Sequence, residues 1–214
     1  SLKNITERYD GYGNSIRRVM EQKNREPGIK GVVADIIHVQ KDYEVAIETA
    51  LGGSIQNIVT DNEQTAKRMI GFLKKNRFGR ATFLPLSNIS GRGGLNQRDV
   101  LSEPGVVGTA NTLVNADKEY SELVMYLLGR VLVVDNIDHA IAIGKKYRHS
   151  LRMVTIEGES LSPGGSMTGG AFKNNSNLLG RRREIEELER SVGILRKELE
   201  ETQKSIGENR SRRN

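Results

Sequence analysis

The 214-residue sequence contains no cysteine. This absence excludes a disulfide framework and metal sites built on thiolates, and it is typical of proteins that work in a reducing compartment. No apolar run approaches the ~20 residues that a bilayer-spanning helix requires. The first residues resemble neither a secretory signal peptide nor a transit peptide. We therefore expect a cytoplasmic protein that makes no contact with a membrane.

Motifs of the common catalytic sites are also missing. The sequence has no Walker A motif, no G-x-S-x-G and no H-E-x-x-H. Its histidines, His38, His139 and His149, are not spaced as metal ligands, either relative to one another or to acidic residues. We expect each histidine to be a surface or structural residue, and the chain to be non-enzymatic, without a metal or a cofactor.

The charge balance leaves two interpretations open. Lys and Arg number 33 against 27 Asp and Glu, which gives a net charge of +6, and the isoelectric point is about 9.5. A polyanionic partner would explain this excess, and so would an ordinary, well-solvated surface. Charge alone does not separate the two.

An internal duplication organises most of the chain. Both copies begin with Gly-Val-Val, at 31–33 and at 105–107, which we interpret as a strand start. An amphipathic helix follows in each copy, with apolar residues at identical spacing. These are Tyr43, Ala46, Ile47, Ala50 and Leu51 in the first copy, and Tyr120, Leu123, Val124, Leu127 and Leu128 in the second. Glycine ends both helices, and two matched helices in matched order make chance an unlikely cause.

The remaining elements repeat in the same order. The first copy continues with predicted strands over 55–60 and 81–84 and, between them, a helix capped by Asp61 whose buried stripe is Ala66, Met69, Ile70 and Leu73. The second continues with strands over 131–134 and 152–156 around a helix behind Asp135-Asn136. We therefore predict an α+β fold of two similar α/β halves, about 31–86 and 105–158, related by a pseudo-twofold axis.

The segments outside the two copies have their own character. A short helix is predicted over about 15–24, before the first copy. The connection over 87–104 holds several glycines and arginines and is long for a loop without secondary structure. We expect this connection to be mobile, with ligand binding as the alternative.

A glycine-rich stretch follows the second copy. Residues 163–170 read Pro-Gly-Gly-Ser-Met-Thr-Gly-Gly, after a hairpin turn predicted at Glu157-Gly158. So many glycines are tolerated where φ is positive or where two backbones pass close to each other. A phosphate-binding loop is the alternative, but neither Gly-Lys-Ser/Thr nor G-x-G-x-x-G spacing is present. We favour close approach of two backbones.

From Leu178 onward the sequence changes to a heptad pattern. Apolar residues alternate at spacings of three and four, with charged residues between them, as in the seam of a coiled coil. The seam consists of Ile185, Leu188, Val192, Leu195, Leu199, Thr202 and Ile206. Within the chain only the stripe Leu2, Ile5 and Tyr9 offers a partner, and it reaches only the base of the seam. We expect the chain to be part of a protein with a long antiparallel coiled coil.

The chain resembles the hinge domain of SMC (structural maintenance of chromosomes) proteins of the bacterial chromosomal type. Three stretches carry the resemblance: 43–53 (Tyr-Glu-Val-Ala-Ile-Glu-Thr-Ala-Leu-Gly-Gly), 79–86 (Gly-Arg-Ala-Thr-Phe-Leu-Pro-Leu) and 163–170. It covers about residues 9–172. The implied organisation is an incoming arm over 1–14, a first hinge half over 15–104, a second half over 105–172 and a returning arm over 173–214.

The resemblance also implies a function. Family hinges join two SMC chains through paired sheet edges, with the glycine-rich motif at the contact, and the ATPase heads lie at the far end of the arms. This implies a homodimer in chromosome condensation and segregation, located in the cytoplasm at the nucleoid. The implied interface residues are Gly164, Gly165, Ser166, Met167, Thr168, Gly169 and Gly170.

DNA binding is a further implication, because family hinges bind DNA near the coiled-coil junction. The candidate residues for double- or single-stranded DNA are Lys173, Arg181, Arg182 and Arg183 at the junction, and Lys74, Lys75, Arg77 and Arg80 in a second cluster. The alternative from another class is a ligand- or phosphate-binding α/β domain that uses the Gly164–Gly170 loop.

Overall fold

The computed structural model describes residues 9, 11–91, 93–171 and 178–213. Residues up to Leu179 form one compact unit, and residues from Gly180 onward form a second. The first unit combines helices with several small sheets, and the second is helical. The predicted α+β class with a C-terminal helix is therefore confirmed.

Helices and strands alternate along the first unit. The α-helices of the chain are α2 (Asn14–Met20), α3 (Val33–Ile36), α4 (Glu44–Leu51), α5 (Glu63–Asn76), α6 (Ser121–Leu128), α7 (Ile137–Lys146) and α8 (Leu178–Arg213). Short 3-10 helices are η1 (Lys41–Tyr43), η2 (Gly52–Gln56), η3 (Arg98–Ser102), η4 (Ala110–Leu113) and η5 (Lys118–Tyr120). The strands are β1 (Ile29–Val32), β2 (His38–Val39), β3 (Ile58–Thr60), β4 (Phe83–Pro85), β5 (Val106–Thr109), β6 (Val114–Asn115), β7 (Val131–Val134), β8 (Arg152–Thr155), β9 (Ser160–Leu161) and β10 (Met167–Thr168).

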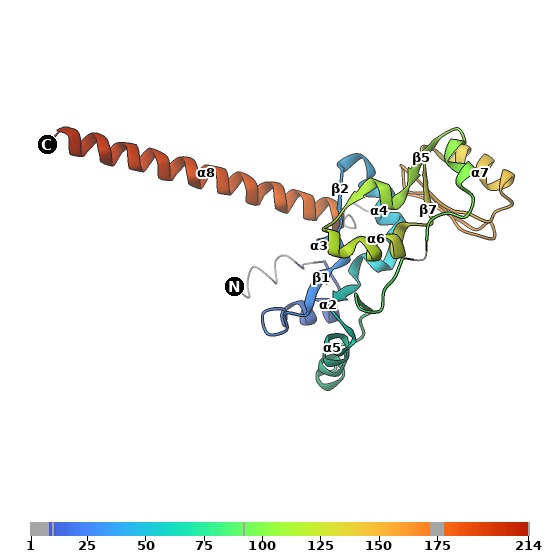
Figure 1. Cartoon of the computed structure of the whole chain (residues 1–214), viewed down its shortest axis with the longest axis horizontal. Coiled ribbons are helices and arrows are strands. Elements are labelled where there is room, and N and C mark those ends of the chain that lie inside the picture. Colours follow the sequence, from blue (N-terminus) through green and yellow to red (C-terminus); the bar gives the residue numbers. More distant parts are fainter. Residues whose placement is uncertain (1–8, 10, 92, 172–177, 214) are drawn as a thin grey trace. The chain divides into compact units, whose positions relative to one another are not determined.

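The duplication predicted from the sequence is present in the fold, but the predicted match of the two Gly-Val-Val stretches is wrong by three residues, because Gly31 is equivalent to Gly108 and not to Gly105. Adding 77 to the residue numbers of β1, η1 and α4 gives the bounds of β5, η5 and α6. Adding 74 to the first residue of α5 gives the first residue of α7. The equivalent helices α4 and α6 pack against each other within the first unit (Figure 1).

The two halves also build their sheets in the same way. β1 and β5 pair antiparallel with β3 and β7, which pair parallel with β4 and β8. Both antiparallel pairs carry an irregularity at a glycine, between Ile29 and Gly31 and between Val106 and Gly108. The second sheet is extended by β9 and β10 to the order β10-β9-β8-β7-β5. A third sheet joins the halves, since β2 pairs antiparallel with β6.

Strand β7 is buried on both faces. Val131 and Val133 belong to the larger hydrophobic cluster, whereas Leu132 and Val134 belong to a smaller one that includes Ala140 and Ile143 of α7. Burial of each such side chain stabilises the fold by about 1.5–3 kcal/mol. The short continuous apolar run at 131–134 therefore forms the buried strand that the sequence predicts.

Some predicted boundaries are wrong. Val33 begins α3 instead of continuing the strand, and the predicted strand over 55–60 begins only at Ile58, because Gly52–Gln56 form η2. β4 begins at Phe83 and includes Pro85, which was predicted to end it. Ile70, predicted to be buried on α5, is 46 % exposed. The boundary errors share a cause: local apolar patterns do not reveal where a short 3-10 turn or an edge strand replaces regular structure.

The connection between the halves is only partly irregular. It contains η3, whose Val100 is fully buried. Glu103, directly after η3, forms an ion pair with Lys146 of α7. The prediction of a mobile connection is therefore wrong for its second part, which packs on the second half. Residue 92 lies outside the described residues.

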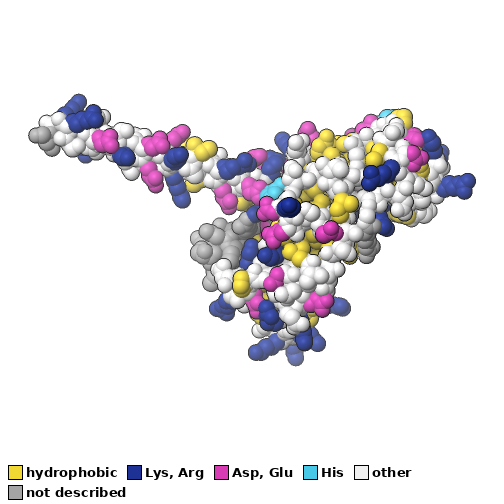
Figure 2. All heavy atoms as spheres, viewed as in Figure 1, with side chains coloured by type: hydrophobic (Ala, Val, Ile, Leu, Met, Phe, Trp, Pro, Cys, Tyr) yellow, Lys and Arg dark blue, Asp and Glu magenta, His cyan; other side chains and the backbone are white. Residues whose placement is uncertain are grey.

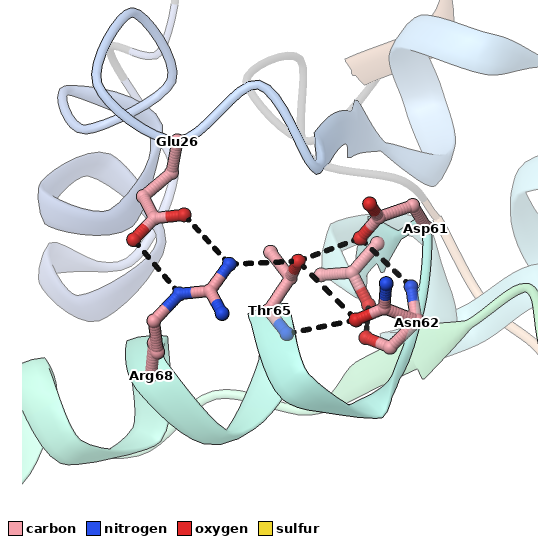
Figure 3. Close-up of polar contacts among 6 residues, drawn as sticks. Glu26, Asp61, Asn62, Thr65 and Arg68 are labelled. Carbon is pink, nitrogen blue, oxygen red and sulfur yellow. Dashed lines mark hydrogen bonds and ion pairs between the residues drawn. The ribbon is translucent and has the colours of Figure 1, made fainter.

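The helices α5 and α7 begin with the same capping arrangement. The caps are Asn62, one residue beyond the predicted Asp61, and Asn136 of the predicted Asp135-Asn136 pair. Asn62 Oδ1 accepts from the N–H of Thr65 at 3.1 Å, and Asp61 Oδ1 accepts from the Thr65 hydroxyl at 2.6 Å (Figure 3). The hydrogen bond from Thr65 is the main reason that the pKa of Asp61 lies below its ordinary value.

A second layer of contacts holds α5 to the segment before β1. The guanidinium of Arg68 donates to both carboxylate oxygens of Glu26, each at 3.0 Å, and to the hydroxyl of Thr65 at 3.3 Å (Figure 3). Such a two-point pair fixes orientation as well as distance. It ties the first turns of α5 to the chain that leads into the first sheet.

The second unit is the helix α8 from Gly180 onward. Its predicted seam residues Leu188, Val192, Leu195, Leu199 and Ile206 are 44–65 % exposed. The predicted arm partners Leu2 and Ile5 lie outside the described residues. Over the described ranges, no helix combines the length and the apolar character that crossing a bilayer requires.

Candidate dimerisation edge and nucleic-acid surfaces

The glycine-rich stretch forms the second arm of a β-hairpin. Gly164 and Gly165 make its turn, with φ values of 96° and 103° that a residue with a side chain adopts only under strain. The N–H of Gly164 donates to the carbonyl of His149 at 2.8 Å, and the N–H of Gly165 to that of Ser162 at 3.0 Å. Both amides are thus used inside the protein, which argues against a phosphate-binding loop at this place.

The strand after this turn, β10, lies at the end of the five-stranded sheet. Ser162 N–H donates to the carbonyl of Ser166, and Met167 pairs with Leu161. In an antiparallel pair the bonded positions alternate, so the backbone N–H and C=O of Met167 and Gly169 point away from β9. The Met167 side chain is 52 % exposed. This edge can therefore accept another strand.

Strand β4 is the end strand of the three-stranded sheet. It is equivalent in topology to β8, yet β8 is covered by β9 and β4 is not followed by such a hairpin. The inward bonds of its neighbours run from Ile58 N–H to Thr82 O and from Leu86 N–H to Thr60 O. By alternation, the backbone groups of Phe83 point outward. Pro85 occupies the next outward position, where its missing N–H breaks no bond inside the sheet.

A cavity of about 350 Å³ lies between α4 and the glycine-rich hairpin. Its lining residues are mostly small or hydroxyl-bearing: Glu48, Thr49, Gly52, Gly158, Ser160, Thr168, Gly169, Gly170 and Ala171. Burial raises the pKa of Glu48 to about 7, the hydrogen bond from the Leu178 N–H opposes this rise, and the charge of Glu44 adds to it. A carboxyl group with a raised pKa therefore lines the same cavity as Thr168, Gly169 and Gly170 of the candidate interface.

Both chain segments that lead into the predicted arms are anchored in the first unit. Leu178 and Leu179, the first residues of α8, are 8 % and 3 % exposed and belong to the larger hydrophobic cluster. The Leu178 N–H donates to Glu48 Oε1 at 2.9 Å. On the other segment, the Tyr9 hydroxyl donates to Asp35 Oδ2 at 2.5 Å. Tyr9 and Leu178 are thus each held by a hydrogen bond within the first unit.

The basic cluster on α5 is open to solvent. Lys74, Lys75, Arg77 and Arg80 are all exposed, and none forms an ion pair with another described residue. Arg77 ends α5 in the left-handed conformation, with φ 53°. Figure 2 shows basic side chains gathered over the part of the surface where α5 lies. Lys74 and Lys75 thus lie in the last turn of α5, Arg77 caps it, and Arg80 follows in the segment before β4.

Three of the four candidate residues predicted at the coiled-coil junction, Arg181, Arg182 and Arg183, lie on α8. Arg182 forms an ion pair with Glu186 at 3.3 Å, and Arg183 one with Glu187 at 3.1 Å. Arg181 is exposed, and Lys173 lies outside the described residues. Pairs of this kind along one helix stabilise it by about 0.2–0.5 kcal/mol each. They therefore lower the net charge of the cluster but hold the arginine side chains only weakly.

Reasoning from the sequence missed Glu48 as a candidate site residue. Adding 77 to its number gives Met125, so the second copy has an apolar side chain at the equivalent position. Because the second copy has methionine at this position, the carboxyl group of Glu48 is not required by the α/β unit itself. This difference between the copies is the signal in the sequence that points to Glu48. Only the structure, however, places it against Leu178 and the glycine-rich strand.

These features define a class of protein: a duplicated α/β hinge with a glycine-rich sheet edge and a heptad helix after it. The chain belongs to the SMC hinge family, since the model of the SMC proteins Flexible Hinge Domain matches residues 26–144. The resemblance inferred from the sequence is thereby confirmed.

Individual relatives agree with this assignment. The chain is similar to the chromosome partition protein Smc of Bacillus subtilis, with 43 % identity over 188 residues, or 86 % of this chain. The Smc protein of Lactiplantibacillus plantarum is 39 % identical over 195 residues, or 90 % of this chain. The matched region is 16 % of each of these relatives, so the chain spans a small part of their length.

Solved structures of hinges have the same fold. The hinge domain of Geobacillus stearothermophilus SMC, crystallised as an asymmetric dimer, is 38 % identical with a TM-score of 0.81, and the match covers 92 % of this chain and 80 % of that one. The Pyrococcus furiosus SMC hinge domain is 31 % identical with a TM-score of 0.63, and the match covers 81 % and 92 %.

Proposed function

We propose that this chain is the homodimerisation module of an SMC chromosome partition protein, and that it joins two coiled-coil arms. The observation that carries the proposal is the open edge of β10, whose outward N–H and C=O groups follow a turn built from Gly164 and Gly165. A free sheet edge is stabilised by pairing with a strand of another chain. The names of the relatives, and the dimeric crystal of the Geobacillus stearothermophilus hinge, support the same function.

The receiving edge in the partner is β4. The repeat supports this choice, because β8, the equivalent of β4, already carries the strand β9 on its outer side. In a twofold dimer, β10 of each protomer would pair with β4 of the other, so two identical junctions would form. Both edges are then covered, and no open strand remains at either junction.

Cross-linking tests this arrangement, since the chain has no cysteine of its own. The Met167→Cys and Thr82→Cys variants place thiols on exposed residues of β10 and beside Phe83 of β4. We expect a short thiol-reactive linker to join one protomer of each variant when the two are mixed, which gives a species of twice 23.8 kDa. Cross-linking of Met167→Cys alone, without the second variant, would instead indicate that β10 pairs with β10.

We further propose that the hinge binds DNA without sequence preference. The exposed cations at and just after the end of α5 support this proposal, because side chains without an acidic partner among the described residues are available for phosphates. The heptad stripe of α8 supports an antiparallel partner helix, which the incoming arm of the same chain would supply. The ATPase activity, if the whole protein has the domains of its relatives, lies outside this chain.

A further inference from the structure

Glu48 lies where the candidate interface and the root of the C-terminal arm meet. One carboxylate oxygen, Oε1, accepts the N–H of Leu178, the first residue of α8, at 2.9 Å. The same side chain lines the cavity that Thr168, Gly169 and Gly170 of the hairpin also line. A single ionisable group therefore contacts Leu178, where α8 begins, and lines a cavity beside β10, the strand proposed to pair in the dimer.

The surroundings of Glu48 disfavour its negative charge. Among the described residues that line the cavity, Glu48 alone carries a charge; the others are glycine, alanine, serine and threonine. The charged group that acts on it is Glu44, one turn earlier on α4 and 3 % exposed, which repels a second carboxylate. Burial and this repulsion outweigh the one hydrogen bond from Leu178 and hold the pKa of Glu48 at about 7.

The cavity is the place that a partner strand would cover. Its lining includes Thr168 of β10 and the two residues that follow, and the outward backbone groups of Met167 and Gly169 form the adjoining edge. A strand laid along that edge would exclude water from the mouth of the cavity. Removal of water from a carboxylate favours its neutral form.

We propose that dimerisation of this hinge is linked to protonation of Glu48, so that the neutral carboxyl group favours the closed dimer and the carboxylate opposes it. This inference rests on the proposed dimer through β10. A bound proton removes the charge that the partner would otherwise bury, while the neutral group still accepts the Leu178 N–H. The dissociation constant of the dimer therefore rises with pH over the range in which Glu48 ionises.

The sign follows from linkage. The partner makes Glu48 harder to ionise, so the dimer binds more protons than the two separate chains, and low pH favours the state that binds more protons. If dimerisation takes up on the order of one proton per dimer, the dissociation constant rises about tenfold per pH unit within this range. Above it, where both states are ionised, the dependence levels off.

The test compares dissociation constants at pH 6.0, 7.0 and 8.5 by analytical ultracentrifugation. The unaltered chain is expected to dimerise more weakly at each step to higher pH. The Glu48→Gln variant keeps an acceptor for Leu178 and cannot ionise, so it is expected to dimerise with one affinity at all three values. Glu157→Gln is the matched control: it makes the same change on an exposed residue next to Gly158 of the cavity lining, and its pH dependence should equal that of the parent.

Histidine is the other side chain that commonly changes charge near neutral pH. The nearest one to the hairpin is His149, whose ring lies 3.8 Å from the position of a Cβ on Gly165. The His149→Gln variant should retain the pH dependence of the parent. Loss of the dependence in this variant, with its retention in Glu48→Gln, would overturn the inference.

A measurement on the unaltered chain needs no variant. Dilution calorimetry in buffers of different ionisation enthalpy reports the number of protons released when the dimer dissociates. We expect proton release between pH 6 and 8. A dimer whose dissociation releases no protons in this range contradicts the role of Glu48 and leaves the dimer itself intact. A chain that is monomeric at every pH contradicts both the dimer and its linkage.

Discussion

His38 and Asn115 lie opposite each other in the β2–β6 pair, and they are equivalent residues of the two halves, since 38 plus 77 gives 115. Val39 pairs with Val114, which is the equivalent of Ile37. An antiparallel pair in which a residue meets its own equivalent has a local twofold axis through that pair. The predicted pseudo-twofold relation of the halves thus passes through this two-stranded sheet.

The first prediction concerns the glycines at the two strand irregularities. Gly31 and Gly108 are equivalent residues with φ values of 141° and 156°, where a Cβ is strained. We expect Gly31→Ala and Gly108→Ala each to lower the free energy of unfolding by about 1–3 kcal/mol. Urea denaturation measures this. Gly53→Ala is the control, because no atom lies within 4 Å of its added Cβ; equal stabilities for all three variants would contradict the prediction.

The second prediction concerns the paired helix caps. Asn62 Oδ1 accepts from Thr65 N–H at 3.1 Å, and Asn136 Oδ1 accepts from His139 N–H at 2.9 Å. Replacement of either asparagine by alanine should cost about 1 kcal/mol of unfolding free energy, since one helix-end N–H loses its partner. Aspartate at the same positions should restore most of the loss. An alanine variant as stable as the parent would show that the cap is not needed.

Much of this architecture could be predicted from the sequence, because both copies of the repeat have the same spacing of apolar residues. The stripes of α4 and α6 and the run in β7 predict buried elements, and these residues are buried except Tyr43 and Leu127, which are partly buried. The cap of α5 was placed one residue early, since Asp61 and Asn62 are both good capping types and the choice depends on where the helix axis begins. The pattern alone does not contain that information.

The candidate site was only partly predictable. The glycine cluster marks a special backbone, but the sequence does not tell a turn from a contact; the structure divides it into the turn at Gly164 and Gly165 and the edge strand that follows. Glu48 has no sequence signature except its contrast with Met125 in the second copy. Its raised pKa comes mainly from burial in the folded chain, and the hydrogen bond from Leu178, far away along the chain, only partly opposes this rise.

The third prediction concerns stability against pH. Burial raises the pKa of Glu48 from 4.5 to about 7 in the folded chain. The folded state therefore binds a proton that the unfolded chain has lost between these values, so the contribution of Glu48 to stability falls as pH rises from about 4.5 to about 7. Glu48→Gln should match the parent at pH 4.5 and melt about 2–4 °C higher above pH 7, allowing for solvent screening of a partly exposed group. A melting difference that is constant with pH would contradict this.

The fourth prediction concerns the strand after the glycine turn. A Cβ on Gly169 would lie 3.2 Å from Glu159 Cγ, and Gly170 has φ 133°. The double variant with valine at both positions should weaken dimerisation at least ~tenfold, about 1.4 kcal/mol, because side chains separate the two backbones. Gly71→Val on the exposed face of α5 is the control. An unfolded double variant would show that these glycines are needed inside the protomer, and an unchanged dimer would place the contact elsewhere.

The last prediction decides between the two basic clusters. The cations at and just after the end of α5, Lys74, Lys75, Arg77 and Arg80, are exposed without acidic partners among the described residues, whereas Arg182 and Arg183 are paired with glutamates of α8. If about three or four phosphates are neutralised, the logarithm of duplex affinity falls against that of salt concentration with a slope near −3.

Replacement of Lys74, Lys75, Arg77 and Arg80 by glutamate should therefore flatten the slope of affinity against salt. It should also weaken binding to every DNA sequence alike. The same change at Arg181, Arg182 and Arg183 should have a smaller effect, since two of these charges are already partly compensated on the helix. Fluorescence anisotropy with duplexes of two unrelated sequences measures both quantities. If the α8 variant loses binding and the α5 variant keeps the parent slope, the DNA surface lies at the arm root, because α5 would then contribute none of the phosphate contacts.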